Sequence, residues 1–178
     1  MKKQILMPLV TIAVAAAMLL GASIGLQGVG NAKAQSEHIR IMQTILPGST
    51  EFVVEPYAGD DANIRSVHKG ENGFVIETVV YGYADDIRMM VGVSNEGTVT
   101  GLVVMDMNET FGLGAEALTD HVFLAQLLNT SGEAEVGTNV DAITGATVTS
   151  KAVVRSVNSA VAFVTGADTD SGATSWGG

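Results

Sequence analysis

The sequence contains no cysteine among its 178 residues. This absence excludes disulfides, thiolate-bound metals, iron–sulfur clusters and catalysis by a thiol. A redox role would therefore need a cofactor that is held by other side chains. The three histidines (His38, His68 and His121) lack the spacing of metal ligands, so we expect no metal site.

Basic residues are also scarce. The chain has nine lysines and arginines against nineteen acidic residues, and three of the nine precede residue 35. The part after residue 34 therefore holds six basic and nineteen acidic residues, which gives it a net charge of −13. A domain this acidic does not bind nucleic acid or anionic lipid headgroups through its charge.

Charged residues are absent from a long apolar run near the N-terminus. After Lys3 no charged residue occurs until Lys33, and residues 5–24 are almost entirely apolar. A span of about 20 apolar residues crosses a bilayer, so we expect one transmembrane helix at 5–24 within an anchor and linker at 1–34. The N-terminal lysines place the N-terminus in the cytoplasm and the rest on the extracytoplasmic face of the cell membrane. The alternative is a secretory signal cleaved near Ala34, although the run exceeds the usual ~7–15 apolar residues.

The remainder of the chain predicts one α+β domain at 35–165, with an antiparallel sheet and packed helices. Apolar periodicity predicts helices at 37–46, 118–129 and 150–164. Runs rich in β-branched residues predict strands at 74–84, 87–94 and 98–107, with a hairpin turn at 95–97. The segment 131–143 is predicted to be a polar connector with one short strand. Residues 166–178 are rich in Gly, Ser, Thr and Asp, so we expect a disordered tail.

The segment "DAITGATVTS" at 141–150 is the best candidate for chemistry. Gly145 and Ala146 leave the backbone beside Thr147 unshielded, and Thr149 or Ser150 is the expected N-cap of the next helix. A hydroxyl near a helix N-terminus is well placed to carry a phosphate group. The alternative is an ordinary N-cap turn without chemistry. The tail repeats the pattern as "DTDSGATS" at 168–175, but no helix can follow Thr174, so we expect no role for that copy.

The segment "DAITGATVTSKAVV" resembles the flavinylation motif of the FMN-binding domain family. The segment "NETFGLGAEA" at 108–117 resembles the second signature of that family, and the two occur in the family's order about 30 residues apart. The resemblance implies FMN esterified through its phosphate to Thr147, in a motif recognised by a separate flavin transferase. That motif comprises Asp141, Thr144, Gly145 and Ala146. The other residues that the resemblance assigns to the FMN site are Thr149, Ser150, Glu109, Thr110, Gly112, Leu113 and Gly114.

Two residues of the second signature depart from the family pattern. Phe111 stands where proline is usual, and Met107 stands where we expect histidine. These departures leave the attachment site unchanged and bear on how the loop contacts the flavin. Phe111 offers a ring for stacking instead.

The chain further resembles the G subunits of Rnf-type ion-translocating electron-transport complexes. The resemblance implies a membrane-anchored electron carrier between ferredoxin and NAD, working with integral membrane and peripheral subunits and without catalytic residues of its own. The alternatives are the C subunit of a sodium-pumping quinone reductase, a stand-alone extracytoplasmic FMN carrier, and an anchored binding or scaffold domain whose threonine is unmodified. A hydrolase with a Ser or Thr nucleophile is least favoured, because no credible histidine or lysine base stands beside the motif.

Overall fold

The computed structural model describes residues 33–107 and 114–167. The chain divides between Arg40 and Ile41, and the unit from Ile41 onward holds the sheet. A helix covers residues 33–45. Among the described residues no helix is both long enough and apolar enough to span a membrane. The predicted membrane helix at 5–24 lies outside the described residues.

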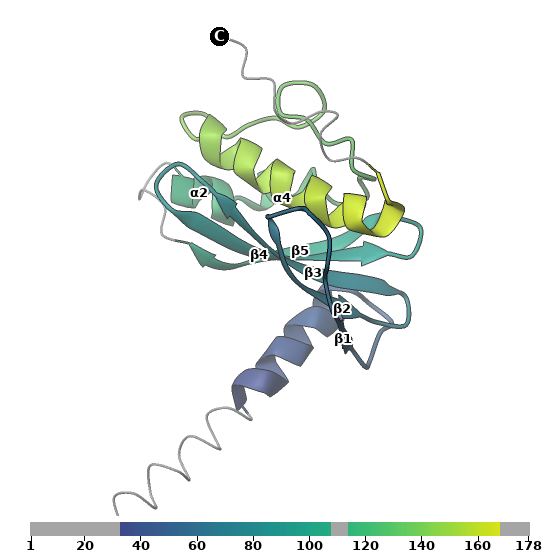
Figure 1. Cartoon of the computed structure of the whole chain (residues 1–178). Coiled ribbons are helices and arrows are strands. Elements are labelled where there is room, and N and C mark those ends of the chain that lie inside the picture. The colour runs from purple at the N-terminus through teal and green to yellow at the C-terminus, as the bar shows by residue number, and fades with distance from the viewer. Residues whose placement is uncertain (1–32, 108–113, 168–178) are drawn as a thin grey trace, which may run out of the picture. The chain divides into compact units, whose positions relative to one another are not determined.

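Five antiparallel strands form a single meander in the order β1-β2-β3-β4-β5 (Figure 1). The predicted sheet is confirmed for its last three strands, and the predicted turn at 95–97 joins the last two. The first two strands were missed because they are short and mix polar with apolar residues. The strand bounds are β1 Val53–Glu55, β2 Ile64–Lys69, β3 Gly73–Tyr81, β4 Asp86–Ser94 and β5 Val99–Met107.

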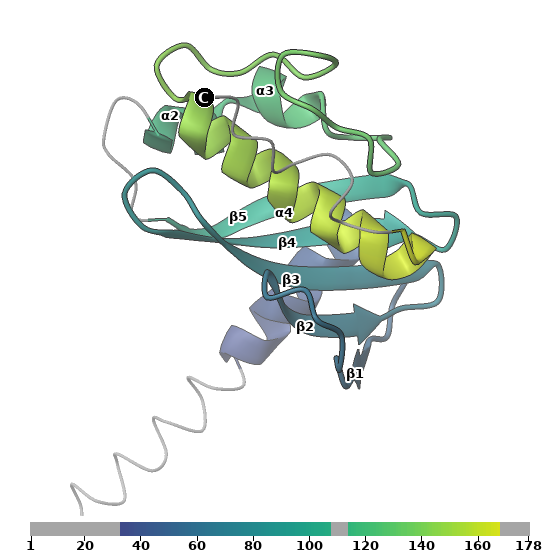
Figure 2. The ribbon, with the colours of Figure 1, turned by 45° about the horizontal axis from the view of Figure 1, so that its top comes forward.

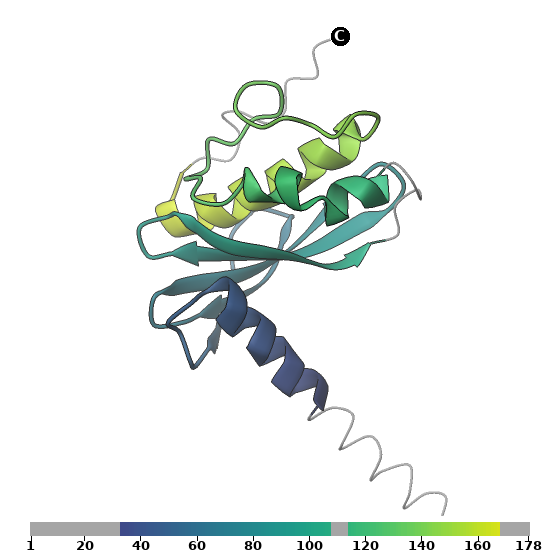
Figure 3. The same cartoon turned by 180° about the vertical axis from the view of Figure 1, so that it is seen from behind.

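The helices α2 (Gly114–Thr119), α3 (His121–Ala125) and α4 (Thr147–Thr165) cover one face of this sheet (Figure 3). Alternate strand residues, such as Ile76 and Val91, pack with valines of α4 in the main hydrophobic core. Two buried serines of α4 also form side-chain hydrogen bonds with residues outside the helix. Ser156 shares a hydrogen bond with Thr78 of β3, and Ser159 accepts one of 3.1 Å from the Asn63 amide.

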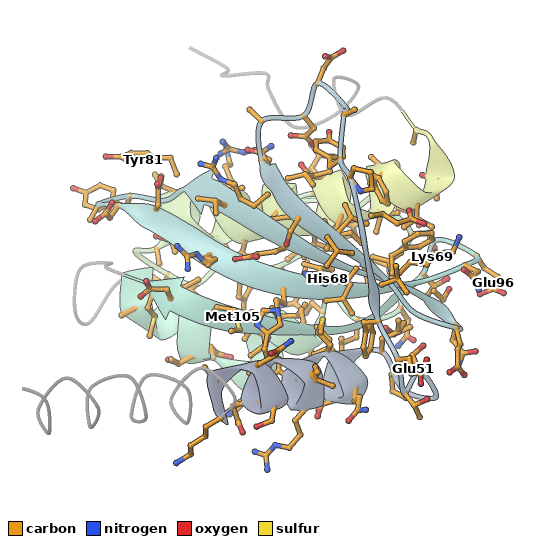
Figure 4. All side chains as sticks on the ribbon, turned by 60° about the horizontal axis from the view of Figure 1, so that its bottom comes forward. Glu51, His68, Lys69, Tyr81, Glu96 and Met105 are labelled. Carbon is orange, nitrogen blue, oxygen red and sulfur yellow. The ribbon has the colours of Figure 1, made fainter. Side chains whose placement is uncertain are left out.

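A smaller core lies on the opposite face, where Met42, Ile45 and Leu46 pack against Val75 and Met90. Figure 4 views this face, from which His68 of β2 and Met105 of β5 project. The backbone of Ile45 approaches the sheet closely at paired glycines of β4 and β5. A Cβ at Gly92 would lie 2.3 Å from the Ile45 carbonyl oxygen, and one at Gly101 would lie 2.7 Å from the Ile45 Cα.

The prediction of one helix at 118–129 is wrong. The chain breaks at Asp120, whose extended backbone (φ −73°, ψ 108°) ends α2 and caps α3. The residues after α3 continue as turns, and Asn129 takes a positive φ of 62°. The apolar spacing predicted a single helix wrongly, because Val122, on the predicted apolar face, is 77 % exposed.

The helix predicted at 150–164 exists but begins three residues earlier. Its N-cap is Ala146, so the prediction that Thr149 or Ser150 caps it is wrong. Its C-terminal end agrees closely with the sequence, since Gly166 closes the helix in the left-handed conformation. In place of the predicted short strand, the connector at 131–143 contains only an isolated bridge between Val136 and Val140.

Candidate functional site at the start of α4

A tight turn brings the motif to the N-terminus of α4. The amide of Ala146 donates a 2.9 Å hydrogen bond to the Ile143 carbonyl, which closes a four-residue turn. Gly145 takes a φ of +82° at the third position of this turn, a conformation that side chains with a Cβ rarely adopt. The glycine of the motif is therefore explained by the backbone.

Thr147 is the first residue of α4, and its side chain is exposed. The N-cap residue Ala146 is buried and offers no side-chain hydrogen bond to the first turn of the helix. Within the described part of the chain, no hydrogen bond involves the Thr147 hydroxyl. An exposed hydroxyl therefore lies at a helix N-terminus whose N-cap residue supplies no side-chain hydrogen bond.

The next hydroxyl residues of the helix differ from Thr147 in burial. Thr149 and Ser150 are both fully buried. The Ser150 Oγ donates to the Ala146 carbonyl at 2.9 Å and accepts from the Ile143 amide at 3.2 Å, which ties the turn to the helix. Ser150 therefore stabilises the motif, and contact of either residue with FMN stays a prediction.

Gln126 holds the other end of the motif, a contact that sequence reasoning missed. Its Oε1 accepts a 2.8 Å hydrogen bond from the Asp141 amide, and its Nε2 donates to the Asp141 carbonyl at 3.4 Å. The carboxylate of Asp141 and the side chain of Thr144 remain exposed. The motif thus has a fixed backbone and an accessible surface, as recognition by a second protein requires.

A cavity of about 260 Å³ opens beside Thr147. Figure 2 shows α2, the start of α4 and the β3–β4 turn at the same end of the domain. The described cavity lining carries no charged side chain; it consists of Tyr83, Gly114, Gly145, Ala146, Thr147, Val148 and Thr149. Ligand pockets usually measure ~300–1,000 Å³, so a cavity of this size and polarity fits part of FMN and leaves the rest outside.

The structure brings Gly114 of the second signature to the flavinylation motif, although 30 residues separate it from Gly145. The other assigned residues of that signature, Glu109, Thr110, Gly112 and Leu113, lie outside the described residues, as does Phe111. Met107 is the last residue of β5 and is 39 % exposed. Tyr83 was missed because nothing in its local sequence marks it as a cavity residue.

A second hollow, of about 410 Å³, lies on the opposite face of the sheet among charged side chains of β2 to β5. Arg88 and Glu77 form an ion pair there at 3.7 Å, and Ser66 donates to Glu77 at 2.9 Å. Among the described residues no group of three side chains could hold a metal ion. The charged side chains around the second hollow are exposed to solvent or half-buried, and Thr147 is not part of its described lining.

Comparisons with known proteins identify the family of this chain. An FMN-binding domain matches residues 82–162, which include every described residue of the cavity beside Thr147. The chain is 32 % identical to the G subunit of the Na⁺-translocating ferredoxin:NAD⁺ oxidoreductase complex of Acetobacterium woodii, over 67 % of this chain and 70 % of that one. It is 36 % identical to the G subunit of the ion-translocating oxidoreductase complex of Methanosarcina acetivorans, over 69 % and 72 %.

This chain belongs to the RnfG family of G subunits. Another G subunit, from the proton-translocating ferredoxin:NAD⁺ oxidoreductase complex of Clostridium ljungdahlii, is 36 % identical over 52 % of this chain and 53 % of that one. The G subunits similar to this chain thus come from complexes named for different ions.

Proposed function

We propose that this RnfG-family chain is an electron-transfer subunit of an ion-translocating ferredoxin:NAD oxidoreductase complex and carries FMN covalently on Thr147. Membership of the family supports the first part. The observation that carries the second part is the exposed Thr147 hydroxyl, which lines a cavity within the matched FMN-binding segment whose described lining is uncharged. The proposal names no coupling ion, because similar subunits come from sodium- and proton-translocating complexes.

The start of α4 suits a phosphate ester. The threonine oxygen displaces a leaving group from the phosphorus of a flavin nucleotide, and the hydroxyl proton leaves with that group. The remaining phosphate anion then lies at the positive end of the helix dipole, beside a first turn that its N-cap Ala146 does not cap with a side chain. Lys151 follows one helical turn later, is exposed, and presents the nearest basic side chain in the sequence.

The accessible motif supports a flavin transferase as maturation partner. Asp141, Thr144, Gly145 and Thr147 are all exposed, whereas the residues that hold the motif in place are buried or bonded. A separate enzyme can therefore reach the hydroxyl in the folded protein. FMN, once attached, supplies the one-electron chemistry, and the chain binds and orients it without catalytic residues of its own.

The anchor at residues 5–24 completes the proposal. It would hold the domain on the extracytoplasmic face of the membrane, beside the integral membrane and peripheral subunits of the complex. A dissociable FMN would be lost from that face to the medium. An ester bond prevents this loss and keeps the electron carrier at the membrane surface.

The proposal is tested by co-expressing the full chain with a flavin transferase, denaturing it and recording flavin fluorescence in the gel. We expect a fluorescent wild-type band, a dark Thr147→Ala band and a fluorescent Thr174→Ala band. Thr147→Ser keeps a hydroxyl at the same position and should retain fluorescence. A dark wild-type band would refute the carrier and favour an unmodified binding domain. Loss of fluorescence only in Thr174→Ala would move the site to the tail.

A further inference from the structure

We infer that Tyr83 contacts the isoalloxazine ring of the FMN carried on Thr147, an inference that rests on the proposed function. Tyr83 and Thr147 line the same cavity, although 64 residues separate them in the sequence. The ribityl chain of FMN separates its phosphate from its ring. Attachment at Thr147 therefore leaves the ring free to lie against another wall of the cavity.

The position of Tyr83 is fixed by a short hairpin turn. Tyr81 at the end of β3 pairs with Asp86 at the start of β4, so only residues 82–85 connect the strands. The Gly82 amide donates to the Asp85 carbonyl at 2.9 Å, and the Asp86 amide donates to the Asp85 carboxylate at 2.8 Å. The turn therefore holds Tyr83 at a defined place beside the start of α4.

Tyr83 is the only aromatic residue in the described cavity lining. It is 64 % exposed, so much of its side chain is accessible to a ligand. Aromatic rings associate through offset or edge-on contacts, and an isoalloxazine system can make such a contact with a tyrosine ring.

The chemistry of the cavity favours the ring over the phosphate as the partner of Tyr83. The described domain is strongly acidic, yet the described lining of this cavity is uncharged, with Val148 and Ala146 among its apolar residues. An uncharged, partly aromatic surface suits a flat heterocycle. The phosphate is already accounted for at the helix N-terminus, on the Thr147 side.

The neighbouring Tyr81 offers a matched control. It is 63 % exposed on the same hairpin but does not line the cavity. Its hydroxyl donates to the Ala84 carbonyl at 3.4 Å. Figure 4 shows the Tyr81 side chain extending from the hairpin end of β3. Tyr81→Leu and Tyr83→Leu therefore remove similar exposed rings, only one of which should touch the flavin.

The test uses the full chain loaded by a flavin transferase, with flavin fluorescence measured in the native and the denatured protein. The denatured signal reports attachment, and the ratio of native to denatured signal reports contact with the ring. Light-excited flavin takes one electron from a touching tyrosine and returns it at once, which quenches fluorescence without net oxidation. We expect the ratio to rise severalfold in Tyr83→Leu and to stay at the wild-type value in Tyr81→Leu. Visible circular dichroism of the flavin should change in Tyr83→Leu alone.

Tyr83→Phe keeps a ring but removes the electron-donating phenol. We expect its fluorescence ratio to rise while its visible circular dichroism stays like that of the wild type. If Tyr83→Leu does not load flavin, this variant decides the question by the same ratio. A wild-type ratio in Tyr83→Leu or in Tyr83→Phe, or equal changes in Tyr81→Leu, would overturn the inference. A wild-type chain that is dark when denatured would instead refute the proposed function.

Discussion

Single residues explain most of the motif at the start of α4. Gly145 permits the positive φ of the turn, and the small, buried Ala146 caps the helix without a side-chain bond. Ser150 closes the turn from inside with two hydrogen bonds to the backbone. Thr144 and Thr147 both expose a hydroxyl, but Thr147 is the one that begins α4 and lines the cavity. The turn thus accounts for Gly145, Ala146 and Ser150, and the position of Thr147 favours it for chemistry.

Replacement of Gly145 by alanine should reduce flavin loading by distorting this turn. A Cβ at φ +82° costs about 1–2 kcal/mol, so the backbone of the turn shifts and displaces Thr147. We expect a weaker fluorescent band in the gel assay and a lower free energy of unfolding in urea. Gly137→Ala is the matched control, because Gly137 has a φ of +88° and open space around its Cβ position. It should lose similar stability and keep full fluorescence; equal loading of both variants would contradict this role of Gly145.

The sequence predicted the residues of the motif but not their distant partners. Thr147 and Gly145 could be predicted because the motif is a sequence pattern that lies within ten consecutive residues. Gln126 and Tyr83 contact or face the motif only after the chain folds, and an isolated glutamine or tyrosine has no local pattern to reveal it. The predicted N-cap was wrong because hydroxyl residues are preferred at that position, whereas here the Ser150 hydroxyl donates to the Ala146 carbonyl from within the first turn.

At the scale of elements, capping decides where the helices before the motif begin and end. The Asp120 carboxylate accepts hydrogen bonds from the amides of Val122 (2.7 Å) and Phe123 (2.9 Å), which starts a new helix where apolar spacing predicted a continuous one. Strand prediction was more successful because β3, β4 and β5 are rich in β-branched residues. The short β1 and β2, which mix polar with apolar residues, form because each lies beside a longer strand that supplies hydrogen-bond partners. No local pattern indicates this pairing.

Asp120→Ala should destabilise the protein by about 0.5–2 kcal/mol, because it leaves two amides at the start of α3 without their acceptor. Urea unfolding measures this loss. Asp120→Asn retains a capping oxygen and should stay within a few tenths of a kcal/mol of the wild type. The account of the helix break would be wrong if Asp120→Ala were as stable as the wild type.

The glycine pair of β4 and β5 should be required for packing of residues 41–46 on the sheet. Alanine at Gly101 would bring a Cβ within 2.7 Å of the Ile45 backbone, and such overpacking costs about 1–3 kcal/mol. The Thr100 hydroxyl also donates to the Ile45 carbonyl at 2.6 Å, so the helix end cannot move away without losing this bond. Gly101→Ala and Gly92→Ala should both lower the urea midpoint. Wild-type midpoints in both variants would show that the close approach has no energetic importance.

At the scale of the whole molecule, charge and hydropathy divide the chain in two. The apolar run at 5–24 is flanked by lysines, whereas the chain after residue 34 has a net charge of −13. An acidic domain has no charge-based attraction to anionic lipids, so attachment to the membrane would depend on the N-terminal segment alone.

The full chain should therefore stay in the membrane pellet after an alkaline carbonate wash, which removes proteins held by charge. High salt should release none of it, because the proposed attachment is hydrophobic. A C-terminal alkaline phosphatase fusion should be active, as expected for a domain on the extracytoplasmic face. Release by carbonate, or an inactive fusion, would contradict the anchor or its orientation.

The central claim is a phosphate ester between FMN and one threonine, and peptide mass spectrometry tests it most directly. The full chain is matured by a flavin transferase and digested, and the peptide that contains Thr147 is fragmented. The account predicts that this peptide gains the mass of FMN less one water and that fragmentation places the gain on Thr147. An unmodified Thr147 peptide, or the same gain on Thr174, would contradict it.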